Sequence, residues 1–184
     1  MPRGNPGAIA LGPGYLYIAV LGSTEPTDLT TPWASVDDAW TALGYTEEGS
    51  TFNYEVDSEN VEVAEELDPV KVALTGRSLS LEFALAEITA ANLKRALNGG
   101  TITTGTGIVT FEPPALGEEV RTMIGFESED HTERWVYRQC LQVGNIAMAR
   151  KKGADKSTLA CSFSLEKPAA AQPFKAILST ARAA

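Results

Sequence analysis

The chain has 184 residues, 43% of them hydrophobic, and carries 24 acidic against 15 basic side chains, a formal net charge of −9. A chain of this length fits one domain, which buries roughly 70% of the surface that its unfolded form exposes. The acidic balance disfavours a protein that grips nucleic acid. The longest apolar run, residues 15–21, is far shorter than the ~20 residues of a membrane-spanning helix, so we expect no membrane partner.

The first fourteen residues contain three prolines and four glycines. This composition interrupts the apolar segment that a signal peptide requires, so we expect the protein to stay in the cytoplasm in which it is made. We interpret residues 1–14 as an N-terminal arm outside the core.

Apolar side chains recur with a period of two along most of the chain, which predicts β-strands. Glycine-rich or charged turns separate the apolar segments, as in an antiparallel sandwich or barrel. We therefore predict a mainly β fold, an antiparallel β-sandwich or barrel that occupies residues 15–166. The predicted strands are residues 15–21, 50–56, 60–67, 77–85, 107–112, 120–127, 134–143, 145–150 and 157–166.

Charge is divided unevenly along the chain. Residues 1–70 hold thirteen acids and one base, whereas residues 71–184 hold eleven acids and fourteen bases, so the two parts are net −12 and +3. Nine acids and no base lie between residues 47 and 68. Valines interleaved with these acids predict a strand with one apolar face rather than a disordered tail. Three interpretations fit: a solvated strand face, a cation site, or a surface that meets a partner of opposite charge.

The apolar period changes to that of a helix once, at about residues 89–98. Thr89 is a suitable N-cap, Leu93 and Leu97 lie on one stripe, and Gly99 can end the helix. About nine residues are too few for a helix to be stable alone in water, so this stripe must pack on a sheet. We predict one short flanking α-helix.

Residues 167–184 begin with a proline and alanine spacer, and we interpret them as a C-terminal arm. Phe174, Ile177 and Leu178 have the i, i+3, i+4 spacing of one docked helical turn.

Few residues are suited to catalysis. His131 is the one histidine, and its polar neighbours are typical of a hairpin tip. A hydrolase would have to use it beside a nucleophile, and no complete Ser/His/Asp or Cys/His arrangement is apparent. Metal-ligand spacings and phosphate-binding glycine loops are missing as well. We predict no enzymatic activity, no cofactor and no metal site, and we interpret Cys140 and Cys161 as small buried side chains.

Three tryptophans leave a second function class open. Trp33, Trp40 and Trp135 could form a stacking platform for sugars, as in a carbohydrate-binding or adhesin-type β-sandwich module. The first two flank a loop or helical turn, which favours roles as core or loop anchors. Exposure of Trp33 or Trp40 would distinguish the two interpretations.

The order of these features resembles a known family. The stretches GYLYIAVLGSTEPTDL, ALGYTEEGSTFNYEV and VEVAEELDPVKVALTGRSLSLEFALAEITAANLKRALNGG are similar to the major tail protein, or tail tube protein, of bacteriophages with long tails. The resemblance covers residues 14–166. It implies a structural virion protein that forms hexameric rings stacked into a hollow tail tube, contacts other tail proteins at the tube ends, and lets DNA pass without specific binding.

The resemblance also gives the acidic segment a role. In such proteins a long loop between the second and third major strands contacts the neighbouring ring and orders on assembly, and here that loop maps to residues 57–76. Acids of one copy would pair with bases of the next, or would line the lumen and repel DNA phosphates. The candidate interface residues are Asp57, Glu59, Glu62, Glu65, Glu66, Asp68, Lys71, Arg77, Arg150, Lys151 and Lys152.

Overall fold

A computed structural model describes residues 8–10, 12–148 and 156–182 of the chain. Strands dominate these residues, and every strand pair is antiparallel. The predicted mainly β, antiparallel fold is therefore confirmed. The elements are β1 (Tyr15–Val20), α1 (Trp33–Val36), β2 (Thr41–Ala42), β3 (Thr46–Val61), β4 (Lys71–Leu85), α2 (Ala90–Ala96), β5 (Thr101–Gly105), β6 (Ile108–Glu112), β7 (Thr122–Glu127), β8 (Glu133–Gln142), β9 (Leu159–Leu165), β10 (Phe174–Leu178) and the 3₁₀ turn η2 (Thr180–Arg182).

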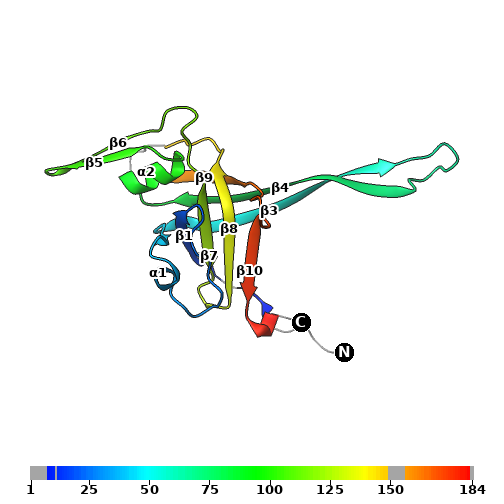
Figure 1. Cartoon of the computed structure of the whole chain (residues 1–184), viewed down its shortest axis with the longest axis horizontal. Helices are drawn as coiled ribbons and strands as arrows, with labels where there is room; N and C mark the ends of the chain where they lie inside the picture. The colour runs from blue at the N-terminus through cyan, green and yellow to red at the C-terminus, as the bar shows by residue number, and fades with distance from the viewer. Residues whose placement is uncertain (1–7, 11, 149–155, 183–184) are drawn as a thin grey trace.

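One sheet forms the body of the molecule, and β5 and β6 form a separate two-stranded sheet. The strands of the main sheet follow the order β2-β1-β7-β8-β9-β4-β3, and β10 pairs with β8 outside this path. Strand β8 contacts three strands because β9 and β10 pair with different parts of it. The β5–β6 hairpin and the far end of β3–β4 project from opposite sides of the body (Figure 1).

The core shows that the main sheet curls onto itself. Leu16 of β1 belongs to the same buried cluster as Leu81 of β4 and Phe163 of β9, although three strands separate β1 from β4 in the sheet. The predicted face of β4 is confirmed, because Leu79, Leu81, Phe83 and Leu85 are all buried. The alternation of apolar residues in this strand therefore supplies one wall of the core.

Helix α2 is confirmed with the predicted N-cap, but it ends at Ala96, so that Leu97 is its C-cap and Ala96 rather than Leu97 is buried in the core beside Leu93. The Thr89 hydroxyl accepts a hydrogen bond of 3.1 Å from the Asn92 backbone N–H, so Thr89 is the N-cap. Leu93 packs on the main core, and Gly99 follows the helix with a positive φ of 129°. The helix covers the end of the sheet beside β5, β6 and β9 (Figure 1).

Two tryptophans anchor a second core cluster, as the sequence favoured. Trp33 and Trp40 are each 3% exposed, and the Trp33 ring stacks on Tyr17 at a centroid distance of 4.8 Å. A Cβ at Gly125 would overlap the Trp33 ring, so the β7 backbone can approach this ring only at a glycine. Neither tryptophan is available to stack on a sugar, which removes the observation on which a carbohydrate-binding module depended.

The C-terminal segment corrects one prediction. Residues 174–178 form strand β10 rather than a helical turn, and they pair with residues 133–137 of β8. Phe174 packs against Phe52 and Trp135, with ring centroids 5.2 and 5.6 Å away. Three apolar residues at this spacing are compatible with a helix, but an open edge of β8 satisfies the backbone of this segment instead.

Two strand predictions change, and two short strands were missed. The strand predicted at 60–67 ends at Val61, because residues 62–70 form the turn that joins β3 to β4. Of the strand predicted at 145–150, residues 145–148 have no strand structure and residues 149–150 lie outside the described residues. The short strands β2 and β5 were not predicted. Both cysteines are buried and free, as expected.

Ion pairs join the loop after β1 to β8 and β10. Glu25, in the loop after β1, accepts hydrogen bonds from Arg138 of β8, and these bonds hold the pKa of the Glu25 carboxyl below its usual range. Lys175 of β10 lies 3.8 Å from the same carboxylate and donates a 3.0 Å hydrogen bond to the Pro26 carbonyl. This network fixes β10 to the loop after β1.

Candidate assembly surface

Strands β3 and β4 continue beyond the body as a long two-stranded arm (Figure 1). We call residues 54–78 the ribbon. Within the region mapped as an acidic loop, residues 57–61 and 71–76 belong to strands, and the turn itself comprises residues 62–70. Backbone hydrogen bonds between β3 and β4 hold the two strands of the ribbon together. Most of its side chains do not contact the body.

One face of the ribbon is apolar. Paired residues on adjacent strands point to the same face, and successive residues alternate between faces. The register pairs Tyr54 with Leu79, Val56 with Arg77, Ser58 with Leu74 and Asn60 with Val72. We call Tyr54, Val56, Val72 and Leu74 the apolar face; their exposed fractions run from 44 to 74%.

This apolar face extends the row of core residues on the same strands. Phe52 of β3 pairs with Leu81 of β4, and both contribute to the main core. The row continues through Tyr54 and Leu79 to residues that nothing covers in the isolated chain. The same period of two therefore produces a buried wall inside the body and an exposed stripe outside it.

The opposite face of the ribbon is acidic. Glu55, Asp57 and Glu59 lie on it, across from Ser78, Gly76 and Ala73. We call these three carboxylates the acidic face. The register shifts between Asp57 and Ser58, a bulge that locally increases the twist of the arm.

The turn at the end of the ribbon carries the remaining acids. A backbone hydrogen bond of 3.0 Å from Val70 N–H to the Val61 carbonyl closes it. Leu67 is fully exposed at its apex. The acids of the turn are Glu62, Glu65, Glu66 and Asp68.

The candidate bases lie in different places. Lys71 begins β4 opposite Val61, and Arg77 donates a 3.2 Å hydrogen bond to Gln172 of the body. Arg150, Lys151 and Lys152 lie outside the described residues. Among the ion pairs of the described chain, none joins an acid of the ribbon to a base.

The structure thus gathers the six predicted acids, Lys71 and Arg77 on one arm. Sequence reasoning missed Tyr54 and Val56 as surface residues, because it assigned them to an ordinary core strand. The signal that would have found them is the continued alternation from residue 52 into the acidic segment without a turn residue between.

His131 lies at the β7–β8 hairpin tip, as predicted, and adopts a positive φ of 54°. Its Nδ1 is 2.6 Å from Glu127 Oε1, and its side chain is 63% exposed. Glu127 is 3% exposed and also accepts hydrogen bonds from Trp33 Nε1 and from Arg134, which is 2% exposed. The role that this geometry supports for Glu127 is to neutralise Arg134 and to join the hairpin to α1.

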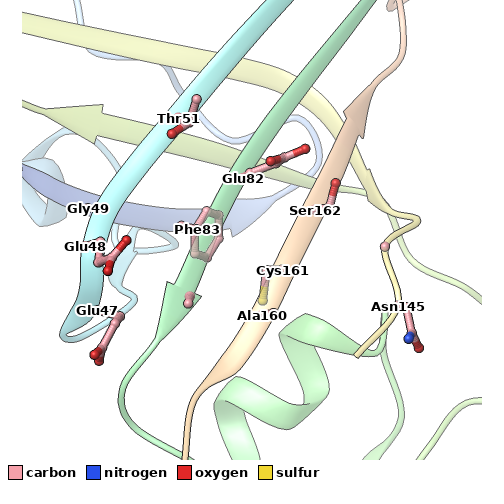
Figure 2. Close-up of a pocket in the computed structure, with 12 residues that line it drawn as sticks. Glu47, Glu48, Gly49, Thr51, Glu82, Phe83, Asn145, Ala160, Cys161 and Ser162 are labelled. Carbon is pink, nitrogen blue, oxygen red and sulfur yellow. The ribbon is translucent and has the colours of Figure 1, made fainter. Parts of the chain in front are cut away.

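A shallow depression crosses β3, β4 and β9 (Figure 2). Glu47, Glu48 and Glu82 line it, and Glu47 forms a 2.6 Å ion pair with Lys156. Burial raises the pKa of the Cys161 thiol at its floor to about 12, so this thiol stays protonated and is a poor nucleophile. Across the described ranges, no group of three or more His, Cys, Asp or Glu side chains is placed to hold a metal ion.

Within the described part of the chain, no helix has the length and apolar character needed to cross a membrane.

The described chain is thus a curled sheet with an exposed arm, one face of which is apolar and the other acidic. The family model for phage tail tube proteins matches residues 3–159. The chain belongs to the phage tail tube protein family, which confirms the resemblance seen in the sequence. Membership implies a structural component of a virion tail that self-assembles into tubes and contacts other tail components.

Two solved structures are similar to the chain over most of its length. A chain in the cryo-EM structure of the anti-feeding prophage (AFP) baseplate, 6-fold symmetrised, has a TM-score of 0.41 and 11% identity over 94% of this chain and 97% of that chain. The crystal structure of Hcp1 from Salmonella typhimurium has a TM-score of 0.31 and 9% identity over 91% of this chain and 97% of that chain. No curated protein matches the chain.

Proposed function

We propose that the chain forms hexameric rings that stack into the tail tube of a phage, through which DNA passes. Family membership supports the tube, and the ribbon supports the stacking. The observation that carries the proposal is that β3 and β4 leave the body as an arm whose apolar face is uncovered in the isolated chain. A monomer gains nothing from such an arm, whereas a second copy can bury it.

Contacts between copies are head to tail, because the ribbon of one copy meets a different surface of the next. Heterologous contacts of this kind close into rings or extend into open stacks, and a tube needs both outcomes. The acids of the turn, such as Glu65 and Glu66, meet bases of the neighbouring copy. The candidate bases are Lys71, Arg77, Arg150, Lys151 and Lys152, of which the last three lie outside the described residues.

DNA passes through the lumen without specific binding, because carboxylates that face the lumen repel the phosphates and prevent adhesion. The role is structural, with no enzymatic activity and no cofactor. Subunits are made in the host cytoplasm and join the virion on assembly, and the end rings contact other tail proteins.

Negative-stain microscopy of concentrated protein tests this proposal. We expect rings with a central hole and six-fold symmetry, and short tubes at higher concentration. Because part of the contact is ionic, assembly should shift between about 50 and 500 mM salt. A chain that stays strictly monomeric at high concentration across this range would refute the proposal.

Limited trypsin digestion tests whether residues 57–76 become fixed on assembly. Trypsin cuts after Lys71 and Arg77, both of which are exposed in the isolated chain. We expect rapid cleavage in free subunits and protection in tubes. Lys175 in β10 is the internal control, because it belongs to the body and donates a hydrogen bond to the Pro26 carbonyl. Equal protection of the ribbon in both states would contradict the idea.

A further inference from the structure

The two faces of the ribbon are suited to different surroundings. Tyr54, Val56, Val72 and Leu74 lie on one face, and Glu55, Asp57 and Glu59 lie on the other. All four apolar residues are about half exposed or more. Family membership does not distinguish between these faces, but the register does.

The apolar face is large enough to be an interaction site. Tyr54, Val56, Val72 and Leu74 are 44 to 74% exposed and adjoin one another in the ladder, and a contiguous exposed apolar patch of this kind marks an interaction site on a soluble protein. It also continues the core row of Phe52 and Leu81, so any covering surface extends an existing core.

The charge on each face indicates which of them can be covered. Arg77 is the charged residue in the ladder of the apolar face, and its guanidinium donates to Gln172 of its own body. The opposite face carries three carboxylates without an ion-pair partner among the described residues. Lys71, opposite Val61, is the one base that the register places on this face, and it forms no ion pair with the three acids among the described residues. Covering the face would therefore remove the hydration of three carboxylates that a single base of the arm cannot neutralise, which is unfavourable.

We propose that a second copy of this chain covers the apolar face in the assembled tube, while Glu55, Asp57 and Glu59 stay in contact with water on the open side of the arm. The proposal rests on the proposed function, since the second copy is the neighbour in the tube. It divides the predicted acids into two groups: Asp57 and Glu59 do not pair with the neighbouring copy, and the acids of the turn remain free to do so.

Thiol labelling of two adjacent positions tests the assignment. Asn60→Cys places a thiol on the apolar side, opposite Val72, and Glu59→Cys places one on the acidic face, opposite Ala73. Neither substitution removes an apolar residue. Cys140 and Cys161 are 0 and 4% exposed, so wild-type protein gives a low background with a maleimide probe.

In free subunits both introduced thiols should react rapidly. In tubes we expect the N60C thiol to react at least tenfold more slowly, and the E59C rate to change less than about twofold. Equal protection of the two thiols, or protection of E59C alone, would overturn the assignment while leaving the tube intact. Wild-type protein that forms no tubes would overturn the proposed function and this assignment with it.

A second pair of variants gives an independent readout. Val72→Thr with Leu74→Thr keeps strand-favouring side chains but removes apolar surface, whereas Asp57→Asn with Glu59→Gln removes two charges from the other face. We expect the first pair to raise the concentration needed for tubes by tenfold or more and the second pair to change it less than threefold. The reverse order would refute the assignment. Thermal melting should be nearly unchanged in both, because these side chains are exposed in the free subunit.

Discussion

Replacing Glu127 by glutamine should destabilise the subunit strongly, although the two side chains have nearly the same size. Glu127 Oε1 lies 2.9 Å from Arg134 Nη2 and Glu127 Oε2 lies 2.6 Å from Trp33 Nε1, in a site that water scarcely reaches. The amide keeps an acceptor but loses the charge. Arg134 would then remain buried without its counter-ion, because its other hydrogen bonds are to backbone carbonyls and its remaining contact is with the Trp33 ring.

Removing one partner of a buried ion pair costs about 3–5 kcal/mol. Because the amide retains a hydrogen-bond acceptor, we expect Glu127→Gln to lower the free energy of unfolding by about 3 kcal/mol, the lower end of this range. At about 2–4 °C per kcal/mol for a chain of this size, the melting temperature should fall by about 6–12 °C. Urea unfolding followed by tryptophan fluorescence measures the loss directly.

The matched control is Glu129→Gln, which removes the same charge from an exposed residue two positions away. Its effect should lie within about 0.5 kcal/mol of zero. If the free energy of unfolding of Glu127→Gln lies within about 1 kcal/mol of that of Glu129→Gln, the buried pair does not stabilise the hairpin and the reasoning is refuted.

Three further predictions concern the isolated subunit. Phe174→Ala should lower the free energy of unfolding by about 2 kcal/mol, less than for a fully buried phenylalanine, and an unchanged urea midpoint would show that β10 is not packed on the body. Hydrogen bonds hold the pKa values of Asp28 and Asp130 at about 2, so their contribution is present above the unfolded value of about 4 and lost as pH falls from about 4 to 2; the double asparagine variant should show a shallower loss of stability across this window. Burial raises the pKa values of Cys140 and Cys161, so neither should react with a disulfide reagent at pH 8 until the protein is unfolded, and rapid reaction of native protein would place a thiol at the surface.

Local sequence patterns were sufficient to predict those elements in which the spacing of the element's own apolar side chains determines which face is buried. The period of two in β4 gives four buried residues on one face, and the Thr89 cap with its apolar stripe gives α2. In both cases a single element contains the whole signal. The family resemblance, carried by the order of these elements, is likewise confirmed by the match over residues 3–159.

Features that depend on distant partners were not predictable from local patterns. The spacing of Phe174, Ile177 and Leu178 predicts a helical turn, and only the open edge of β8 explains why they form a strand. In the sequence Glu127 and Arg134 are typical exposed charges of a hairpin, although both are buried. Residues 57–76 were mapped as a loop from the family resemblance, whereas the pairing of residues 57–61 with residues 71–76 depends on a register that local patterns do not give. The bases beyond residue 149 and the pairing between copies remain predictions.

The bond between Lys175 and the Pro26 carbonyl joins residues 149 positions apart, which has a consequence for the order of folding. The body cannot close until nearly the whole chain has been synthesised, and pairing across such separations is slow. The ribbon, by contrast, is a local hairpin, so its pairs can form transiently as soon as residues 54–78 are available, although a hairpin alone is only marginally stable in water. A nascent chain therefore displays its apolar arm before its body is complete. During this interval the carboxylates on the other face of the arm, together with those of its turn, repel the arms of neighbouring chains and protect the unfinished subunit from edge-to-edge aggregation.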